Sequence, residues 1–167
     1  MTVLETERLA LRRLSPGDAE FILDLLNQPS FLRYIGDKGV RNTEEAINYI
    51  QTGPVASYEQ HGFGLYLVQL KETGASIGIC GLLKRDTLPD VDIGFAFLPA
   101  YWSRGYALES AEAVMKYGRE KFGLQRIVAI TSLNNEASIK LLEKLGMKFE
   151  GVIKLGEDEH EVRLFGT

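Results

Sequence analysis

The alternation of hydrophobic and polar positions changes its period along the chain. The middle of the sequence carries strand-like patterns over 63–70, 77–83 and 91–98, separated by short polar turns. Consecutive strands joined by short turns are typical of an antiparallel meander. After Gly105 the apolar residues recur with a helical period, and a β-rich run returns after Arg126. The chain therefore predicts a sheet that is interrupted by an amphipathic helix.

That helix lies within a predicted β-α-β unit. The helical pattern over 105–122 stands between the strands 91–98 and 126–132, and Gly123 provides a C-terminal stop. Two strands connected through a helix are parallel. A second helix follows, beginning after the N-cap pair Asn134-Asn135.

The flanking segments complete the predicted fold. Pro29 is expected to end the first helix, residues 30–42 to be irregular, and Gly53-Pro54 to interrupt the second helical region before a short segment towards Gln60. The total is an α/β mixed fold of about four helices and about seven strands. Its sheet is mostly antiparallel, splayed at one parallel pair, and forms a single domain over 1–167. The remaining predicted elements are a strand over 4–14, a helix after Asp18, a helix from Thr43, and strands over 147–155 and 161–165.

Composition and charge narrow the class of protein. With 45% hydrophobic and 25% charged residues, the chain has the composition of an ordinary globular domain. The net charge of −4 argues against a nucleic-acid partner, which needs a basic face. We expect neither a membrane span nor a signal peptide, which makes the cytoplasm the expected location.

Cysteine and histidine usage predicts no metal site. Cys80 is the only cysteine, and it stands inside the apolar run 77–83, where a buried strand thiol is expected. His61 and His160 are the only histidines, so no cluster has the spacing of zinc ligands.

The junction between the strand 91–98 and the following helix is the candidate chemical site. Pro99 cannot donate to a sheet ladder, and Gly105 lets the backbone approach a ligand closely. The turn 102–107 would present backbone N–H groups and the positive end of the helix dipole to an anion, with Arg104 adding charge. A plain turn is the alternative interpretation. Neither a P-loop nor a dinucleotide fingerprint is present.

The motifs taken together resemble the GNAT superfamily of acetyl-CoA-dependent N-acetyltransferases. They are similar in particular to the Rim-like branch, which acetylates ribosomal-protein N-terminal residues such as alanine. The segments that carry the resemblance are Thr6 to Arg12, Ile93 to Ala107, and Asn135 to Met147, in the expected order.

The resemblance implies acetyl-CoA as cosubstrate and assigns its contacts. Backbone groups of Phe97 and Leu98 would pair with the pantetheine arm, and the Asn135 side chain would contact the cofactor. Ser138 would protonate or stabilise the leaving thiolate, because Leu142 occupies the position where many relatives carry a tyrosine that acts as general acid. A water molecule is the alternative proton donor. The backbone amides implied for the pyrophosphate are those of Ser103, Arg104, Gly105, Tyr106 and Ala107.

Asp92 is the candidate general base that takes a proton from the attacking amine, either directly or through a water. An exposed strand carboxylate without a catalytic role is the alternative. Glu109 is a second candidate, although a glutamate near a helix N-terminus also fits the helix dipole alone.

The acceptor is expected to be an amine. A protein N-terminus, an aminoglycoside, a polyamine and a free amino acid all remain open. The acidic turn formed by Glu157, Asp158 and Glu159 would attract a cationic acceptor, or is simply solvated. A non-catalytic CoA-binding sensor or scaffold is the alternative function. A generic nucleotide-binding module is disfavoured by the antiparallel lead-in. The sequence predicts no particular oligomeric state, and a homodimer is one option.

Overall fold

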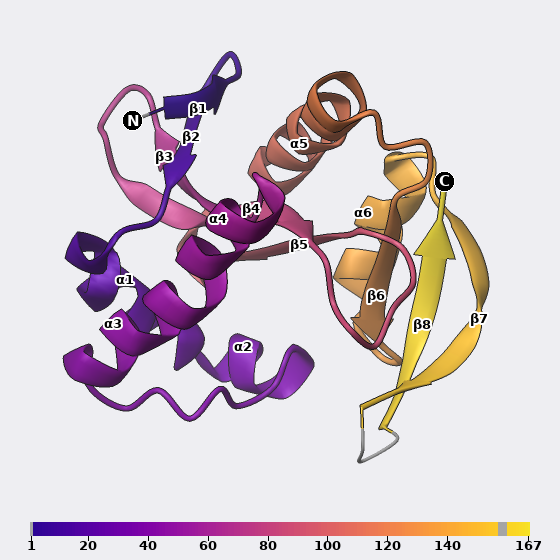
Figure 1. The fold of residues 1–167 in the computed structure, drawn as a ribbon, viewed down its shortest axis with the longest axis horizontal. Helices are drawn as coiled ribbons and strands as arrows, with labels where there is room; N and C mark the ends of the chain where they lie inside the picture. Colours follow the sequence, from indigo (N-terminus) through magenta and orange to yellow (C-terminus); the bar gives the residue numbers. More distant parts are fainter. Residues whose placement is uncertain (1, 157–159) are drawn as a thin grey trace.

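The computed structural model describes residues 2–156 and 160–167. These residues form one eight-stranded sheet in the order β1-β2-β3-β4-β5-β6-β8-β7 (Figure 1). The acidic turn of the sequence analysis, Glu157 to Glu159, lies outside the described residues.

The first five strands are antiparallel to their neighbours, and the last three of them form the predicted meander. The strand expected over 4–14 is divided in two, because Thr6 N–H donates to the Leu9 carbonyl (2.9 Å) and turns the chain. This division accounts for eight strands where about seven were predicted. The five strands are β1 (Thr2–Glu5), β2 (Leu9–Arg13), β3 (Leu65–Leu70), β4 (Ser76–Leu83) and β5 (Asp92–Phe97).

The second part of the sheet confirms the β-α-β unit. β5 and β6 (Val128–Ser132) are parallel, and the helix α5 (Tyr106–Phe122) connects them. The helix α6 (Glu136–Lys144) then leads to an antiparallel pair formed by β7 (Lys148–Leu155) and β8 (His160–Gly166).

The N-terminal helices differ from the prediction in two places. The helix α1 (Ala19–Leu26) is followed by a further helix, α2 (Pro29–Tyr34), where an irregular segment was expected. Pro29 is the first residue of α2. A proline is tolerated there because the N–H of the first helical residue has no acceptor within the helix, so no hydrogen bond is lost.

The second difference concerns Pro54. The helices α3 (Thr43–Ile50) and α4 (Ala56–His61) are joined by a π-helical segment, Gln51–Val55, so the helical path widens at Pro54 and continues. The expected interruption is therefore wrong.

Two apolar layers cover the two faces of the sheet. Buried residues of α5 and α6, including Val114 and Leu142, pack on one face together with Ile127 and Ala129 of the β6 region. Residues of α1, α2 and α3 pack on the other face. Figure 1 shows α1, α2 and α3 grouped together, apart from α5 and α6. None of the described helices is long and apolar enough to cross a membrane.

Candidate active site

The site is a gap between two neighbouring strands in the middle of the sheet. β5 and β6 are in register only at Asp92 and Val128, where Val128 N–H donates to the Val91 carbonyl (3.0 Å). Beyond this point the strands diverge, and Figure 1 shows them running in clearly different directions. β5 stays paired with β4, and β6 with β8, so each strand keeps one unpaired edge along the gap.

The hydrogen-bond alternation identifies the β5 groups that face the gap. Leu98 N–H donates to the Ile77 carbonyl (3.0 Å), one position beyond the pair Gly78–Phe97. Bonded and non-bonded pairs alternate in an antiparallel ladder. Phe97 and, two residues earlier, Phe95 therefore direct their backbone N–H and C=O groups away from β4 and into the gap.

The β6 groups that face the gap are identified by the same alternation. Thr167 N–H donates to the Ile127 carbonyl (3.1 Å), and Val128 stands opposite Gly166. Ile130 and Ser132 therefore direct their backbone groups away from β8. The gap is lined on both sides by main-chain donors and acceptors that an extended, amide-containing ligand can pair with.

Phe97 and Leu98 differ in their availability. The Phe97 carbonyl accepts a hydrogen bond from Trp102 Nε1 (2.9 Å), while its N–H faces the gap. The Leu98 N–H is engaged by Ile77, and the Leu98 carbonyl accepts from Tyr101 N–H (2.9 Å). Of the two residues expected to hold a pantetheine arm, only Phe97 thus presents a free amide to the gap. The Leu98 N–H is therefore not available to the arm, and the expected contact of the Leu98 backbone stays a prediction.

The turn between β5 and α5 has the geometry of an anion site. Ser103 and Gly105 both have left-handed backbone conformations (φ 62° and 82°), which curl successive N–H groups into a concave surface. No side chain caps α5. The first intrahelical bond runs from Glu109 N–H to the Gly105 carbonyl (3.0 Å), which leaves the N–H groups at 106–108 without intrahelical acceptors. The predicted amides from Ser103 to Ala107 lie together at this helix end.

A residue far away in the sequence holds this turn in place. Arg8 Nε donates to Glu109 Oε1 (2.7 Å), and Arg8 Nη1 donates to the Arg104 carbonyl (3.0 Å). The Arg8 guanidinium also stacks on the Tyr106 ring, 4.4 Å from its centroid. Thr6 Oγ1 donates to the same carboxylate. We call these contacts of Thr6, Arg8 and Glu109 with the turn the Arg8 clamp. The sequence does not indicate this role of Arg8, because its partners lie about 100 positions away along the chain.

The Arg8 clamp accounts for the Glu109 carboxylate. Burial raises its pKa, but hydrogen bonds from Thr6 and Arg8 more than offset this effect, so the net pKa lies below the ordinary value of 4.5. A carboxylate that accepts these hydrogen bonds and is held in its charged form is a poor general base. Glu109 is therefore a structural anchor.

The second helix brings two predicted residues to the same end of the sheet. Asn135 caps α6, with Oδ1 accepting from Ser138 N–H (3.3 Å), and α6 starts directly after the gap-lining end of β6. This cap uses the Asn135 oxygen and leaves its NH2 group as the part that can contact a ligand. Ser138 is half-buried in the first turn of α6.

Asp92 lies at the closed end of the gap. Five residues separate it from Phe97, which corresponds to about 16 Å along a strand. Its carboxylate is fully buried and accepts two hydrogen bonds from Arg85, at 3.0 and 3.1 Å. Burial raises the pKa of Asp92, and Arg85 opposes that shift. The structure holds the Asp92 carboxylate in an ion pair with Arg85, which does not favour a role as base, and the alternative of an exposed strand carboxylate is wrong because Asp92 is buried.

Two further expectations concern buried side chains. Cys80 is fully buried on β4, and burial raises the pKa of its thiol to about 12, so the predicted inert strand thiol is confirmed. Leu142 is buried in the apolar layer under α6 and supplies no acidic group. Among residues 2–156 and 160–167, no group of three potential ligands is placed to hold a metal ion.

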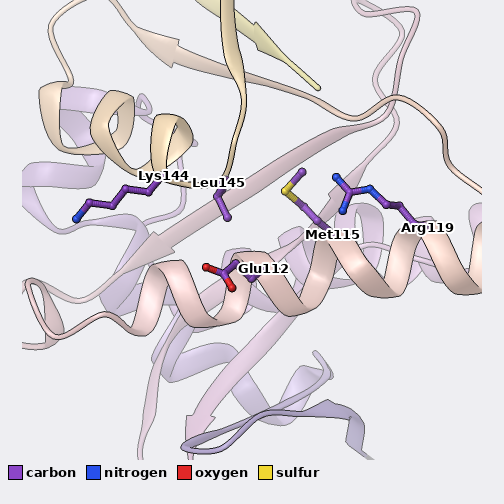
Figure 2. Close-up of a pocket in the computed structure, with 5 residues that line it drawn as sticks. All are labelled: Glu112, Met115, Arg119, Lys144 and Leu145. Carbon is purple, nitrogen blue, oxygen red and sulfur yellow. The ribbon is translucent and has the colours of Figure 1, made fainter.

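A hollow of about 290 Å³ between α5 and the end of α6 is separate from the gap. Figure 2 shows Glu112, Met115 and Arg119 projecting from one side of α5 towards Leu145, while Lys144 points away. Glu112 already lies about 9 Å along the helix axis from the start of α5. The candidate site is thus formed by strand edges and helix ends, and this hollow is not part of it.

A main-chain gap next to a helix N-terminus is the combination that a phosphate-bearing, amide-containing cosubstrate requires, and comparison with known proteins identifies the class. The model of the acetyltransferase (GNAT) domain family matches residues 8–148. The chain therefore belongs to the GNAT acetyltransferase family, whose members transfer an acetyl group from acetyl-CoA to amines.

Individual relatives agree with this class. The uncharacterized N-acetyltransferase YoaA of Bacillus subtilis is 35% identical over 154 residues, covering 91% of this chain and 86% of YoaA. A GNAT-family acetyltransferase structure from Bacillus anthracis superposes with a TM-score of 0.82 at 26% identity, covering 100% of this chain and 98% of that one. The chain is an acetyl-CoA-dependent N-acetyltransferase.

A third neighbour shares the fold. RimL, described as a ribosomal L7/L12 alpha-N-protein acetyltransferase in complex with coenzyme A, superposes with a TM-score of 0.84 at 18% identity, covering 100% of this chain and 97% of RimL.

Proposed function

We propose that the chain acetylates primary amines by direct attack of the amine on the thioester, and that protein N-terminal amines are a principal acceptor class. The resemblance to the Rim-like branch and the shared fold with RimL support this acceptor. The observation that carries the proposal is the gap between β5 and β6, with the uncapped start of α5 beside it.

The residues at the gap have separate roles in this proposal. The N–H groups at the start of α5, with the left-handed turn before it, bind the diphosphate, and the Phe97 amide pairs with the pantetheine arm. The cosubstrate supplies an activated acetyl group. A second main-chain N–H close to Phe97, that of Phe95, also faces the gap and stabilises negative charge that develops on the thioester oxygen.

Ser138 is the proposed partner of the leaving thiolate. It stands in the first turn of α6, at the same edge of the sheet as the start of α5. Asp92 and Glu109 have no part in this proposal, since Arg85 and Arg8 hold their carboxylates. The proton released by the amine passes to solvent.

An acetyl-CoA thiol-release screen tests the proposal. The panel contains peptides with free N-termini, aminoglycosides, polyamines and free amino acids, and mass spectrometry locates the acetyl group on the product. We expect release with N-terminal peptides. Coenzyme A binding without an acetylated product from any class would contradict the proposal and favour the non-catalytic alternative.

Ser138→Ala and Ser138→Thr test the assigned role. We expect Ser138→Ala to lower kcat about tenfold or more with little change in KM for acetyl-CoA, because a group acting on the leaving thiolate acts in the transition state. Ser138→Thr keeps the hydroxyl and should retain most of the activity. Equal kcat values for the wild type and Ser138→Ala would remove Ser138 from the mechanism.

A further inference from the structure

Two adjacent hydroxyl groups at the end of β6 are buried without a hydrogen-bond partner. Thr131 Oγ1 and Ser132 Oγ have no partner among the described residues, and Thr131 is only 7% exposed. Buried polar groups in proteins are nearly always paired, so an unpaired one needs an explanation. Tyr66 Oη on β3 is a third such group, but it lies two strands away from β5.

Side-chain alternation places Thr131 on the face covered by α5 and α6. Ile127 and Ala129 belong to the apolar layer on that face, and Thr131 follows in the same phase along the strand. β6 ends at Ser132 and α6 begins at Glu136, so the helix folds back over the strand. The first turn of α6 therefore covers the end of β6 that contains Thr131.

Thr131 also belongs to the strand that borders the gap. The residues on either side of Thr131, Ile130 and Ser132, direct their backbone groups into the gap, as derived above from the pairing of β6 with β8. Thr131 thus stands at the gap, on the face where α5 and α6 begin. Leu142, one helical turn beyond Ser138, provides only apolar surface there.

We propose that the Thr131 hydroxyl donates a hydrogen bond to the sulfur of coenzyme A, and that Thr131 is a catalytic residue for departure of the thiol. The inference rests on the proposed function, because it requires coenzyme A in the gap. The hydroxyl lacks a partner in the protein alone because its partner is the sulfur of the cosubstrate.

The chemistry balances without any further reactant. The amine nitrogen forms a bond to the acetyl carbon, the carbon–sulfur bond breaks, and the electron pair remains on sulfur. The nitrogen loses one proton to solvent, and the sulfur gains one proton through Ser138 or water. Thr131 keeps its own proton throughout, and its O–H stabilises the negative charge while that charge develops.

Thr131→Val tests the inference in the ligand-free protein first. The substitution removes the hydroxyl and nearly preserves the shape of the side chain. Because the hydroxyl has no partner to lose, the thermal midpoint of the ligand-free variant should equal or exceed that of the wild type. A large fall in the midpoint would reveal a structural partner for the hydroxyl and overturn the inference.

The second measurement compares coenzyme A with desulfo-coenzyme A, in which hydrogen replaces the thiol. Titration calorimetry should show that the wild type prefers coenzyme A by about fivefold, the value of one hydrogen bond. Thr131→Val should bind both ligands equally, whereas Thr131→Ser should keep the preference. Tyr66→Phe is the matched control, since it removes an unpaired buried hydroxyl away from the gap and should also keep the preference.

The outcomes distinguish failure of the proposed function from failure of the role assigned to Thr131. If the wild type binds neither ligand, the proposed function fails and this inference fails with it. If the wild type binds both but Thr131→Val keeps the full preference, or if the wild type has no preference, the proposed function stands and the role of Thr131 is refuted.

Discussion

Substitution of Arg8 should weaken coenzyme A binding although Arg8 belongs to the N-terminal hairpin. Arg8→Ala removes the hydrogen bond to the Arg104 carbonyl and the stacking on Tyr106, and it releases Glu109. The hydrogen bond contributes about 1 kcal/mol and an exposed cation–π contact about 0.5–1 kcal/mol. The ion pair adds little, because Arg8 is 43% exposed.

These contributions sum to about 1.5–2 kcal/mol for holding the turn. If the turn binds the diphosphate only in its clamped geometry, the dissociation constant for coenzyme A rises about 10- to 30-fold. Titration calorimetry measures this change directly. The loss of stability should be similar in size, which corresponds to a fall in Tm of about 3–8 °C for a chain of this length.

Arg13→Ala is the matched control. Arg13 belongs to β2, the strand that follows Arg8, and it also stacks on a tyrosine, with its guanidinium 5.0 Å from the Tyr58 ring centroid, but it does not contact the turn. It should lower Tm slightly and leave coenzyme A affinity unchanged. If Arg8→Ala and Arg13→Ala bind coenzyme A equally well, the Arg8 clamp does not position the turn.

The Arg8 clamp also predicts a pH dependence. Since the folded protein lowers the pKa of Glu109 below 4.5, the contribution of Glu109 to stability is fully present above that value. It is lost as the pH falls through the lowered pKa. The difference in unfolding free energy between the wild type and Glu109→Gln should therefore be constant above about pH 5.5 and shrink in acid. Chemical denaturation at several pH values measures it, and a constant difference down to pH 2 would contradict this origin.

Three further substitutions test other parts of the site. Gly105 has a left-handed backbone, and Gly105→Ala places a Cβ 3.2 Å from Arg8 Nη2. The resulting strain of about 1–2 kcal/mol should lower coenzyme A affinity about tenfold in calorimetry. Unchanged affinity would refute the tight turn. Asp92→Asn leaves Arg85 without its charge partner and should cost about 1–3 kcal/mol in urea denaturation, less than a fully buried pair because Arg85 is 36% exposed. Its kcat should stay within about twofold of wild type, and a 100-fold loss would restore Asp92 as the base. Trp102→Phe frees the Phe97 carbonyl and should raise KM for acetyl-CoA about fivefold in steady-state assays, the effect of one hydrogen bond; an unchanged KM would show that this bond does not order the strand edge.

The features predicted correctly from the sequence were local ones. The β-α-β unit follows from the change of period at Gly105 and from stops at Pro99 and Gly123, all of which act within a few residues of the elements they bound. The turn before α5 is equally local, since its geometry depends on the backbone of consecutive residues, and its binding of an anion stays a prediction.

The features that the sequence did not indicate depend on distant contacts or on neighbouring elements. The division of the first strand lets Thr6 and Arg8 donate hydrogen bonds to the Glu109 carboxylate, and no local sequence pattern indicates these contacts. The role of Asp92 depended on which end of β5 is closed, and that is set by the single register point with β6. The availability of Leu98 depended on the phase of its pairing with β4.

The gap gives the centre of this sheet the exchange behaviour of an edge. Amide hydrogens of central strands are usually among the slowest in a protein to exchange with solvent deuterium. Here the amides of Phe97 and Ile130 belong to interior strands but lack strand partners across the gap. They should therefore exchange far faster than those of β4, one strand away. Filling the gap would then slow the exchange of amides on both halves of the sheet together, which makes these two hydrogens direct reporters of occupancy, independent of catalysis.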